Sequence, residues 1–122
     1  MKEATIIGAG LVGSLLAVYL AKAGYNVKII ERRADMRKES ISAGKSINLA
    51  TSYRGWKALD TIGIGDDIRK IAIPMYGRTI NNEEGETSFH AYGINNQAIY
   101  SVSRGEINCK LMDIAERTGK TK

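Results

Sequence analysis

The chain has 122 residues, of which 43% are hydrophobic and 25% are charged, a size and composition typical of one small globular domain. Its formal net charge of +5 would suit an anionic partner, but the lysines and arginines are scattered instead of clustered with aromatic residues, which argues against nucleic acid. The single cysteine, Cys109, excludes an intramolecular disulfide and favours a reducing compartment, so we expect a cytoplasmic protein.

The first element is an uncharged run of 18 residues, 4–21, which approaches the length of a membrane span. Its internal pattern is that of a soluble fold. A β-branched strand over residues 3–7 is followed by three closely spaced glycines, and helical apolar spacing then continues over residues 11–23. No cleavage-site pattern of a secretory signal is present. The run therefore predicts a strand, a tight turn and a helix, with no membrane segment in this chain.

A second strand, residues 26–30, follows this helix and ends at Glu31. Glu31 comes 18 residues after Gly13, where dinucleotide-binding folds place an acid that accepts hydrogen bonds from a ribose. Gly8 would allow the sharp exit from the strand, Gly10 the approach of a pyrophosphate to the backbone, and Gly13 close packing of helix against strand. The unpaired N–H groups at the helix start attract phosphate. These residues together predict a dinucleotide site.

The identity of the dinucleotide is narrowed by Glu31, because its charge would repel the 2′-phosphate of NADP. FAD and NAD remain as candidates for the bound cofactor. Two other interpretations stay open: an NAD-binding dehydrogenase and a non-catalytic nucleotide-binding module. The dehydrogenase interpretation expects another βα unit soon after Glu31, whereas residues 32–46 are polar and charged.

The rest of the chain predicts shorter elements that are added to this Rossmann-like βαβ start, which places the fold in the α/β class. They are a short apolar segment at 47–50, a helix at 53–62 capped by Ser52, a helical segment at 66–71 ended by Pro74, a hairpin of 76–81 with 87–92, a strand at 98–102, and a helix at 104–117. Ser103 and Glu106 have the spacing of a capping box for the last helix.

Several stretches resemble the N-terminal part of the kynurenine 3-monooxygenases, a family of flavin-dependent aromatic hydroxylases. They are "IIGAGLVGSLLAVYLAKAGYNVKIIERR", "GKSINLATSYRGWKAL", "IPMYGR", "AYG" and "YSVSRGEIN". The glycine fingerprint is shared by many flavoproteins, whereas the later motifs and their order are specific. The resemblance extends over essentially the whole chain.

The resemblance implies FAD as cofactor, NADPH and O2 as co-substrates, and hydroxylation of L-kynurenine to 3-hydroxykynurenine in tryptophan degradation. It implies no catalytic residue and no metal ligand in this stretch. Arg78 and Tyr92 match positions that hold the substrate carboxylate, a role that suits an arginine fork and a neutral hydroxyl donor. The positions that match FAD-contacting residues of the family are Val12, Ile30, Glu31, Arg32, Arg33, Ala50 and Arg104.

Members of this family are several times longer, so we expect a fragment that is inactive alone and incomplete relative to the full family fold. Its parallel sheet is expected to hold only two strands. Residues of about 1–72 and 98–122 would form the N-terminal portion of the FAD-binding domain, and about 73–97 the beginning of a substrate-binding β-region. Apolar faces left uncovered would favour self-association.

Overall fold

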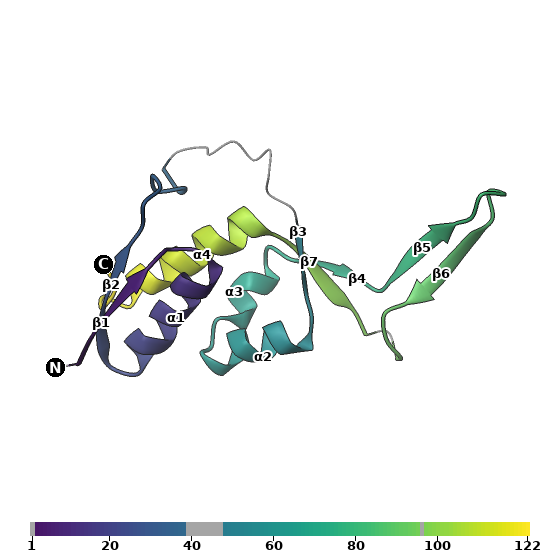
Figure 1. The fold of residues 1–122 in the computed structure, drawn as a ribbon. Helices are drawn as coiled ribbons and strands as arrows, with labels where there is room; N and C mark the ends of the chain where they lie inside the picture. The colour runs from purple at the N-terminus through teal and green to yellow at the C-terminus, as the bar shows by residue number, and fades with distance from the viewer. Residues whose placement is uncertain (1, 39–47, 96) are drawn as a thin grey trace.

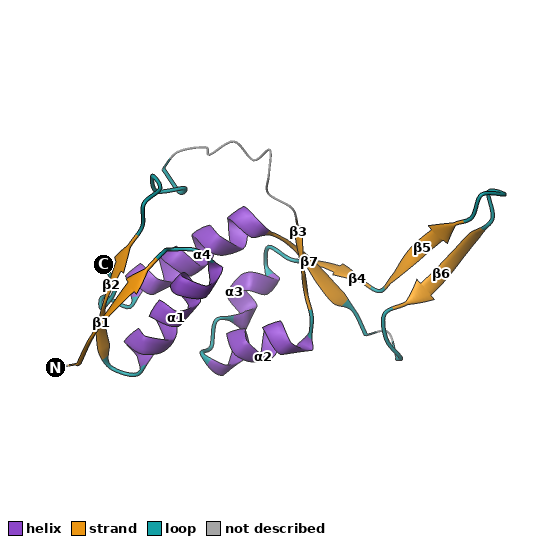
Figure 2. Cartoon of the chain, viewed as in Figure 1, coloured by secondary structure: helices purple, strands orange, loops and turns teal. Residues whose placement is uncertain are grey.

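The arrangement of helices and strands is given by a computed structural model that describes residues 2–38, 48–95 and 97–122. Four helices form the body, the β1–β2 pair lies at one end, and a hairpin projects from the other (Figures 1 and 2). The elements are β1 (Lys2–Ile7), α1 (Leu11–Lys22), β2 (Tyr25–Ile30), β3 (Asn48–Thr51), α2 (Tyr53–Thr61), α3 (Gly65–Arg69), β4 (Ile73–Met75), β5 (Gly77–Asn81), β6 (Thr87–Ala91), β7 (Ile99–Ser103) and α4 (Arg104–Arg117).

The β1–α1–β2 unit confirms the predicted Rossmann-like start. β1 and β2 are parallel and in register from Lys2 opposite Tyr25 to Ile7 opposite Ile30. Parallel strands need a crossover, and α1 supplies it by packing Ala17 and Val18, both fully buried, against the strands. The predicted α/β class is therefore confirmed.

A third parallel position beside β2 is occupied by the last residues of the chain. Thr121 pairs with Val27 in a parallel bridge, and the Lys122 N–H donates to the Val27 carbonyl at 3.0 Å. The Ile29 N–H donates in turn to the Lys122 carbonyl at 2.7 Å. The expectation of a parallel sheet of two strands is confirmed for the described residues, because the bridge at Thr121 is isolated and belongs to no strand.

A separate antiparallel sheet has the order β3–β7–β4. β4 contains Pro74, which was expected only to end the preceding helical segment. Proline lacks the N–H of a ladder bond and is tolerated at a sheet edge, which is where β4 lies. The predicted apolar segment appears as β3, while Ile47 lies outside the described residues.

The two predicted helix caps have different outcomes. Ser103 accepts a hydrogen bond from the Glu106 N–H at 3.4 Å, as the capping-box spacing predicts. Ser52 occupies the N-cap position of α2 but makes no side-chain capping bond. The predicted Ser52 cap is therefore wrong in its hydrogen bond, although the helix begins at the expected residue.

The hydrophobic core lies between the helices and the strands β1, β2 and β7. α1 packs along α4, and Trp56 of α2 meets Tyr100 of β7 edge to face, with ring centroids 5.1 Å apart. The buried apolar side chains are Ile6, Ala17, Val18, Ala21, Val27, Trp56, Leu59, Ile62, Ile64, Ile68, Val102, Ile107, Leu111, Ile114 and Ala115.

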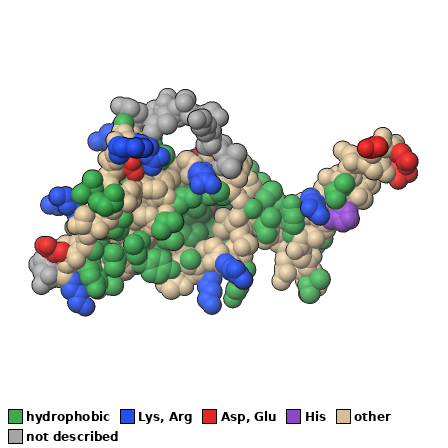
Figure 3. All heavy atoms as spheres, in the orientation of Figure 1, with side chains coloured by type: hydrophobic (Ala, Val, Ile, Leu, Met, Phe, Trp, Pro, Cys, Tyr) green, Lys and Arg blue, Asp and Glu red, His purple; other side chains and the backbone are tan. Residues whose placement is uncertain are grey.

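The β5–β6 hairpin confirms the predicted pair of strands, but it contributes nothing to this core. Every residue of β6 is exposed, and Phe89 is 64% exposed. Acidic side chains gather at its tip in Figure 3. Two strands alone are only marginally stable in water. The hairpin is therefore expected to be the least stable part of the described fold.

No helix within residues 2–38, 48–95 and 97–122 is both long and apolar enough to cross a membrane.

Replacing Gly13 with alanine tests the packing of α1 on β1. A Cβ at this position would overlap the Gly8 carbonyl oxygen, which belongs to backbone and cannot move aside cheaply. Overpacking of this kind costs about 1–3 kcal/mol. We expect Gly13→Ala to lower the free energy of unfolding by about this amount, seen as a lower midpoint of urea unfolding. An unchanged midpoint would show that the helix can shift without cost.

Candidate functional site

The glycine turn between β1 and α1 gives each of its three glycines a different role. Gly8 has φ +103°, a left-handed conformation that favours glycine. Gly13 is required by the close approach of α1 to Gly8. Gly10 has φ −75°, and a Cβ there would meet nothing within 4 Å. Neither backbone strain nor packing calls for glycine at position 10, so the open space in front of it is available to a ligand.

The backbone of Ala9, inside this turn, is held at both its N–H and its carbonyl group. Its N–H donates to Oε2 of Glu31 at 2.7 Å. Its carbonyl oxygen accepts from Ser14 Oγ at 3.2 Å and from Asn108 Nδ2 at 2.9 Å. The turn is therefore fixed by β2, α1 and α4 together.

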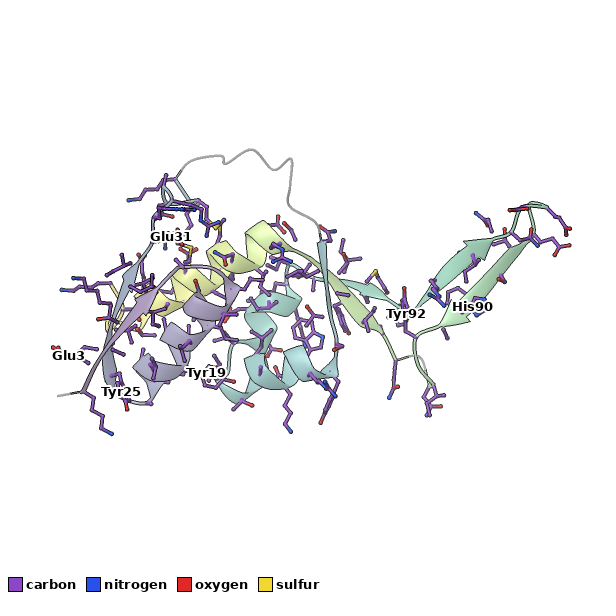
Figure 4. All side chains as sticks on the ribbon, viewed as in Figure 1. Glu3, Tyr19, Tyr25, Glu31, His90 and Tyr92 are labelled. Atoms are coloured by element: carbon purple, nitrogen blue, oxygen red, sulfur yellow. The ribbon has the colours of Figure 1, made fainter. Side chains whose placement is uncertain are left out.

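Glu31 lies at the end of β2 beside the turn (Figure 4). Besides Ala9, its carboxylate accepts from the Arg33 N–H at 2.9 Å and from Arg33 Nε at 3.2 Å. The side chain and backbone of Arg33, followed by the Ala9 N–H, lower the pKa of Glu31 to about 2. The carboxylate is therefore a charged acceptor throughout the physiological range.

A cluster of ion pairs that sequence reasoning missed holds the segment after Glu31 against α4. Arg37, whose side chain is 18% exposed, contacts Asp35 at 2.7 Å and both Asp113 and Glu116 at 2.9 Å. Hydrogen bonds from Arg37 lower the pKa of Asp35 to about 2 and also lower the pKa of Glu116. The sequence around Arg37 is polar and has no pattern that would indicate a partner such as Asp113, 76 residues further along the chain.

A small pocket of about 150 Å³ opens between this cluster and the ends of β1 and β2. Its lining includes Ala9, Glu31, Arg37 and Thr121. Turn, acid and pocket thus meet at the carboxyl ends of the parallel strands, the edge at which such sheets bind ligands.

The other residues predicted near the turn lie on its open side. Val12 is 81% exposed in the first turn of α1, and Ile30 is 46% exposed. Arg32 and Arg33 are also exposed. Their placement leaves them accessible to a ligand, and their predicted contacts with FAD stay predictions.

Arg104 and Ala50 lie further along the body, at the sheet of β3 and β7. Ala50 is exposed and pairs with Ser101, and Arg104 is the exposed first residue of α4. Arg104 precedes Asn108 by four residues, so the two share a helix face about 6 Å apart along the axis. Since Asn108 contacts Ala9, that face is turned toward the glycine turn.

Arg78 and Tyr92 both lie at the hairpin, as predicted. Arg78 pairs with His90, and the Tyr92 N–H donates to the Tyr76 carbonyl at 2.9 Å. Directly opposed residues share a face of the ladder, so Arg78 and His90 share one face, whereas Tyr92 lies just beyond the end of β6.

The expectation that Arg78 and Tyr92 can face one cavity is only half met. Tyr92 lines a pocket of about 930 Å³ at the hairpin base together with Tyr53, Trp56 and Arg69, whereas Arg78 is absent from its lining. Above the Trp56 ring lies the Arg69 guanidinium, 4.5 Å from the centroid. Among the described residues, no group of His, Cys, Asp or Glu is arranged to hold a metal ion.

Comparison with known proteins agrees with this geometry. The sequence profile of the FAD binding domain family matches residues 1–122. The chain belongs to the FAD binding domain family. The FAD cofactor predicted from the motifs is thereby confirmed, and FAD is favoured over NAD.

Curated relatives of this FAD binding domain are named kynurenine 3-monooxygenase. The protein of Flavobacterium johnsoniae is 53% identical over 114 residues, which are 93% of this chain and 25% of that protein. The protein of Myxococcus xanthus is 50% identical over 119 residues, 97% of this chain and 26% of that protein. The predicted resemblance is confirmed, and the chain spans about a quarter of the length of these relatives.

Solved structures show the same fold at low identity. p-Nitrophenol 4-monooxygenase PnpA from Pseudomonas putida has a TM-score of 0.78 at 22% identity, covering 99% of this chain and 31% of that one. A tetrameric form of 2-methyl-3-hydroxypyridine-5-carboxylic acid oxygenase has a TM-score of 0.79 at 17% identity, covering 100% and 31%. These matches support the fold alone.

Replacing Gly10 with alanine separates binding from folding. The backbone angles of Gly10 are ones that alanine also adopts. Alanine has less conformational freedom than glycine in the unfolded chain, which favours the folded state. We expect Gly10→Ala to leave stability unchanged or raised by about 0.5 kcal/mol, while FAD affinity falls about tenfold or more because the Cβ takes the ligand's space. Fluorescence titration with FAD measures the affinity. Equal affinities would contradict a phosphate site at Gly10.

Replacing Arg37 with methionine tests the ion-pair cluster. We expect a loss of about 1–2 kcal/mol in the free energy of unfolding at pH 7, discounted for partial exposure. The folded pKa values of Asp35 and Glu116 are lowered, so their contribution is present above the unfolded values near 4 and is lost as pH falls toward 2. Urea unfolding should therefore show a difference that shrinks below about pH 4. Arg54→Met, at an exposed position of α2, is the control. A difference that stays constant with pH would contradict the ion-pair origin.

Proposed function

We propose that this chain binds the ADP part of FAD at the glycine turn. We propose further that it forms the N-terminal part of a monooxygenase that hydroxylates L-kynurenine to 3-hydroxykynurenine with NADPH and O2. Gly10 carries the first proposal: it is a glycine that neither φ nor packing requires, and open space lies in front of it at the start of a 12-residue helix. A phosphate fits this space and meets unpaired N–H groups there.

The ribose of the ADP part is proposed to bind Glu31. In the structure the carboxylate already accepts from Ala9 and from the backbone and guanidinium of Arg33. A carboxylate offers about four acceptor positions, so ribose hydroxyls gain access when the 51% exposed Arg33 side chain swings away. The Ala9 bond can persist, and the released guanidinium becomes available to the adenine or a phosphate.

An extended dinucleotide also suits the separation of the two groups of predicted residues. Glu31 lies at one end of the molecule and Tyr92 at the hairpin end (Figure 4). Arg104, at the start of α4, lies between them and offers a planar fork of donors to a pyrophosphate. The proposed division follows this order, with residues 1–72 and 98–122 holding FAD and 73–97 beginning the substrate region.

Arg78 and Tyr92 are proposed to hold the carboxylate of kynurenine. Both lie at the hairpin, Arg78 in β5 and Tyr92 just after β6, and an arginine can bind a carboxylate with two parallel hydrogen bonds. Further chain in the longer relatives would complete the cavity, because the described hairpin is exposed on both faces. Bound FAD supplies hydride acceptance and oxygen activation. The residues of this chain supply position and charge.

The location of the protein and its assembly are proposed from its cysteine content and its exposed apolar side chains. We propose a cytoplasmic protein, from its single cysteine. The exposed apolar side chains of Ile7 and Ile94, at 77% and 76%, support self-association of this chain when nothing covers them. We also propose that these 122 residues alone do not hydroxylate kynurenine.

The deciding experiment uses the full natural chain, purified and reduced with NADPH under air. Bound flavin gives an absorbance band near ~450 nm, which NAD lacks. NADPH oxidation should rise on addition of L-kynurenine, with 3-hydroxykynurenine as product. Stimulation by 4-hydroxybenzoate but not by kynurenine would move the proposal to another aromatic hydroxylase, and absence of the flavin band would overturn it.

Replacing Arg78 with methionine tests the substrate site in the same protein. We expect KM for kynurenine to rise about tenfold or more, because a charge-assisted bidentate contact is lost. The flavin content should stay unchanged, since Arg78 lies on the hairpin, far from Glu31. Arg117→Met, at the exposed end of α4, is the matched control and should alter neither quantity. Loss of flavin in Arg78→Met would show that the residue serves FAD instead.

A further inference from the structure

The carbonyl oxygen of Ala9 accepts hydrogen bonds from two buried side chains of different helices. Asn108 of α4 donates from Nδ2 at 2.9 Å, and Ser14 of α1 donates from Oγ at 3.2 Å. Asn108 is 4% exposed and Ser14 is fully buried. A carbonyl oxygen can only accept, so the amide of Asn108 must present its NH2 group to it.

This anchoring determines the direction of the next N–H group in the chain. All peptide bonds of the described residues are trans, and in a planar trans peptide the C=O and the following N–H point in opposite directions. Because the Ala9 oxygen is turned inward to Asn108 and Ser14, the Gly10 N–H is turned outward. Within the described part of the chain it donates to no acceptor, and the space in front of Gly10 is open.

We propose that Asn108 is a positioning residue for the dinucleotide site: it orients the Ala9–Gly10 peptide so that the Gly10 N–H donates to a phosphate of the ligand. This inference rests on the proposed binding of a dinucleotide at the glycine turn. Asn108 is buried beneath the turn, so it would act through the Ala9 carbonyl and not by contact with the ligand. An unanchored peptide could rotate and present its carbonyl oxygen, which repels phosphate.

The surroundings of Asn108 favour this single arrangement. Its Nδ2 also lies 3.1 Å from the sulfur of Met36 and 3.5 Å from that of Met112. Thioethers are weak acceptors, so the Ala9 oxygen is the strong acceptor within reach. A buried amide hydrogen without an acceptor is costly, which holds the amide and the peptide in place.

Arg104 and Asn108 would then have two different roles in phosphate binding from the same face of α4. Both belong to the motif "SVSRGEIN", one turn apart on α4. The exposed Arg104 offers charge to the phosphates, whereas the buried Asn108 sets the direction of a backbone donor.

The test compares ADP with adenosine in the full natural chain after removal of bound flavin. Asn108→Leu keeps a similar volume and removes both amide donors. We expect its affinity for ADP to fall about tenfold, as for a lost hydrogen bond to a charged group. Affinity for adenosine should stay within about twofold, because adenosine has no phosphate to meet the Gly10 N–H. Isothermal titration calorimetry measures both ligands.

Two further variants keep the test decisive. Ser14→Ala removes the other donor to the same oxygen from a different helix, and should weaken ADP about threefold while sparing adenosine. If Asn108→Leu fails to fold, Ser14→Ala still tests whether anchoring of the Ala9 carbonyl affects ADP binding. Ile107→Val perturbs the packing of α4 next to Asn108 without removing a donor, and should change neither ligand.

The outcomes separate this inference from the proposed function. Equal losses for ADP and adenosine would show that Asn108 only supports the fold, and unchanged ADP binding would show that the peptide needs no anchor. Either result overturns the inference while the dinucleotide site stands. A wild-type protein that binds neither ADP nor adenosine would overturn the site, and the inference with it.

Discussion

The described structure depends on the backbone of one residue, Ala9, more than on any other contact outside the core. Its N–H is held by Glu31 at the end of β2, and its carbonyl oxygen by Ser14 of α1 and Asn108 of α4. Residues that are separated by up to 99 positions meet at this point. A turn whose donors must face a phosphate cannot be left to fluctuate, since orientation determines whether N–H or C=O meets the ligand.

The strength of this framework is uneven along the molecule. Around the turn, α1 lies against α4, and Arg37 fastens the segment after Glu31 to the same helix. At the other end the hairpin has exposed residues on both faces. The end proposed to bind the ADP part of FAD is thus largely organised by this chain itself, whereas the hairpin end lacks such support within the described residues.

Much of the fold could be predicted because the relevant patterns are local. Alternating and helical spacing predicted β1, α1 and β2, and the turn residues between β5 and β6 predicted the hairpin. The isolated bridge of Thr121 to β2 has no such local pattern, because it forms only when distant parts of the chain meet. Pro74 was misjudged for a similar reason, since its place at a sheet edge depends on β7.

By itself the sequence determined the glycine turn and the acid at Glu31, since these depend on residue types at fixed short spacings. Its resemblance to a known family then indicated FAD over NAD. Only the tertiary structure decided what holds the turn, through Asn108, and what fastens the following segment, through Arg37. It also decided that Tyr92 lines the larger pocket while Arg78 does not. Such contacts join residues far apart in the chain, and no local periodicity records which distant side chains will meet.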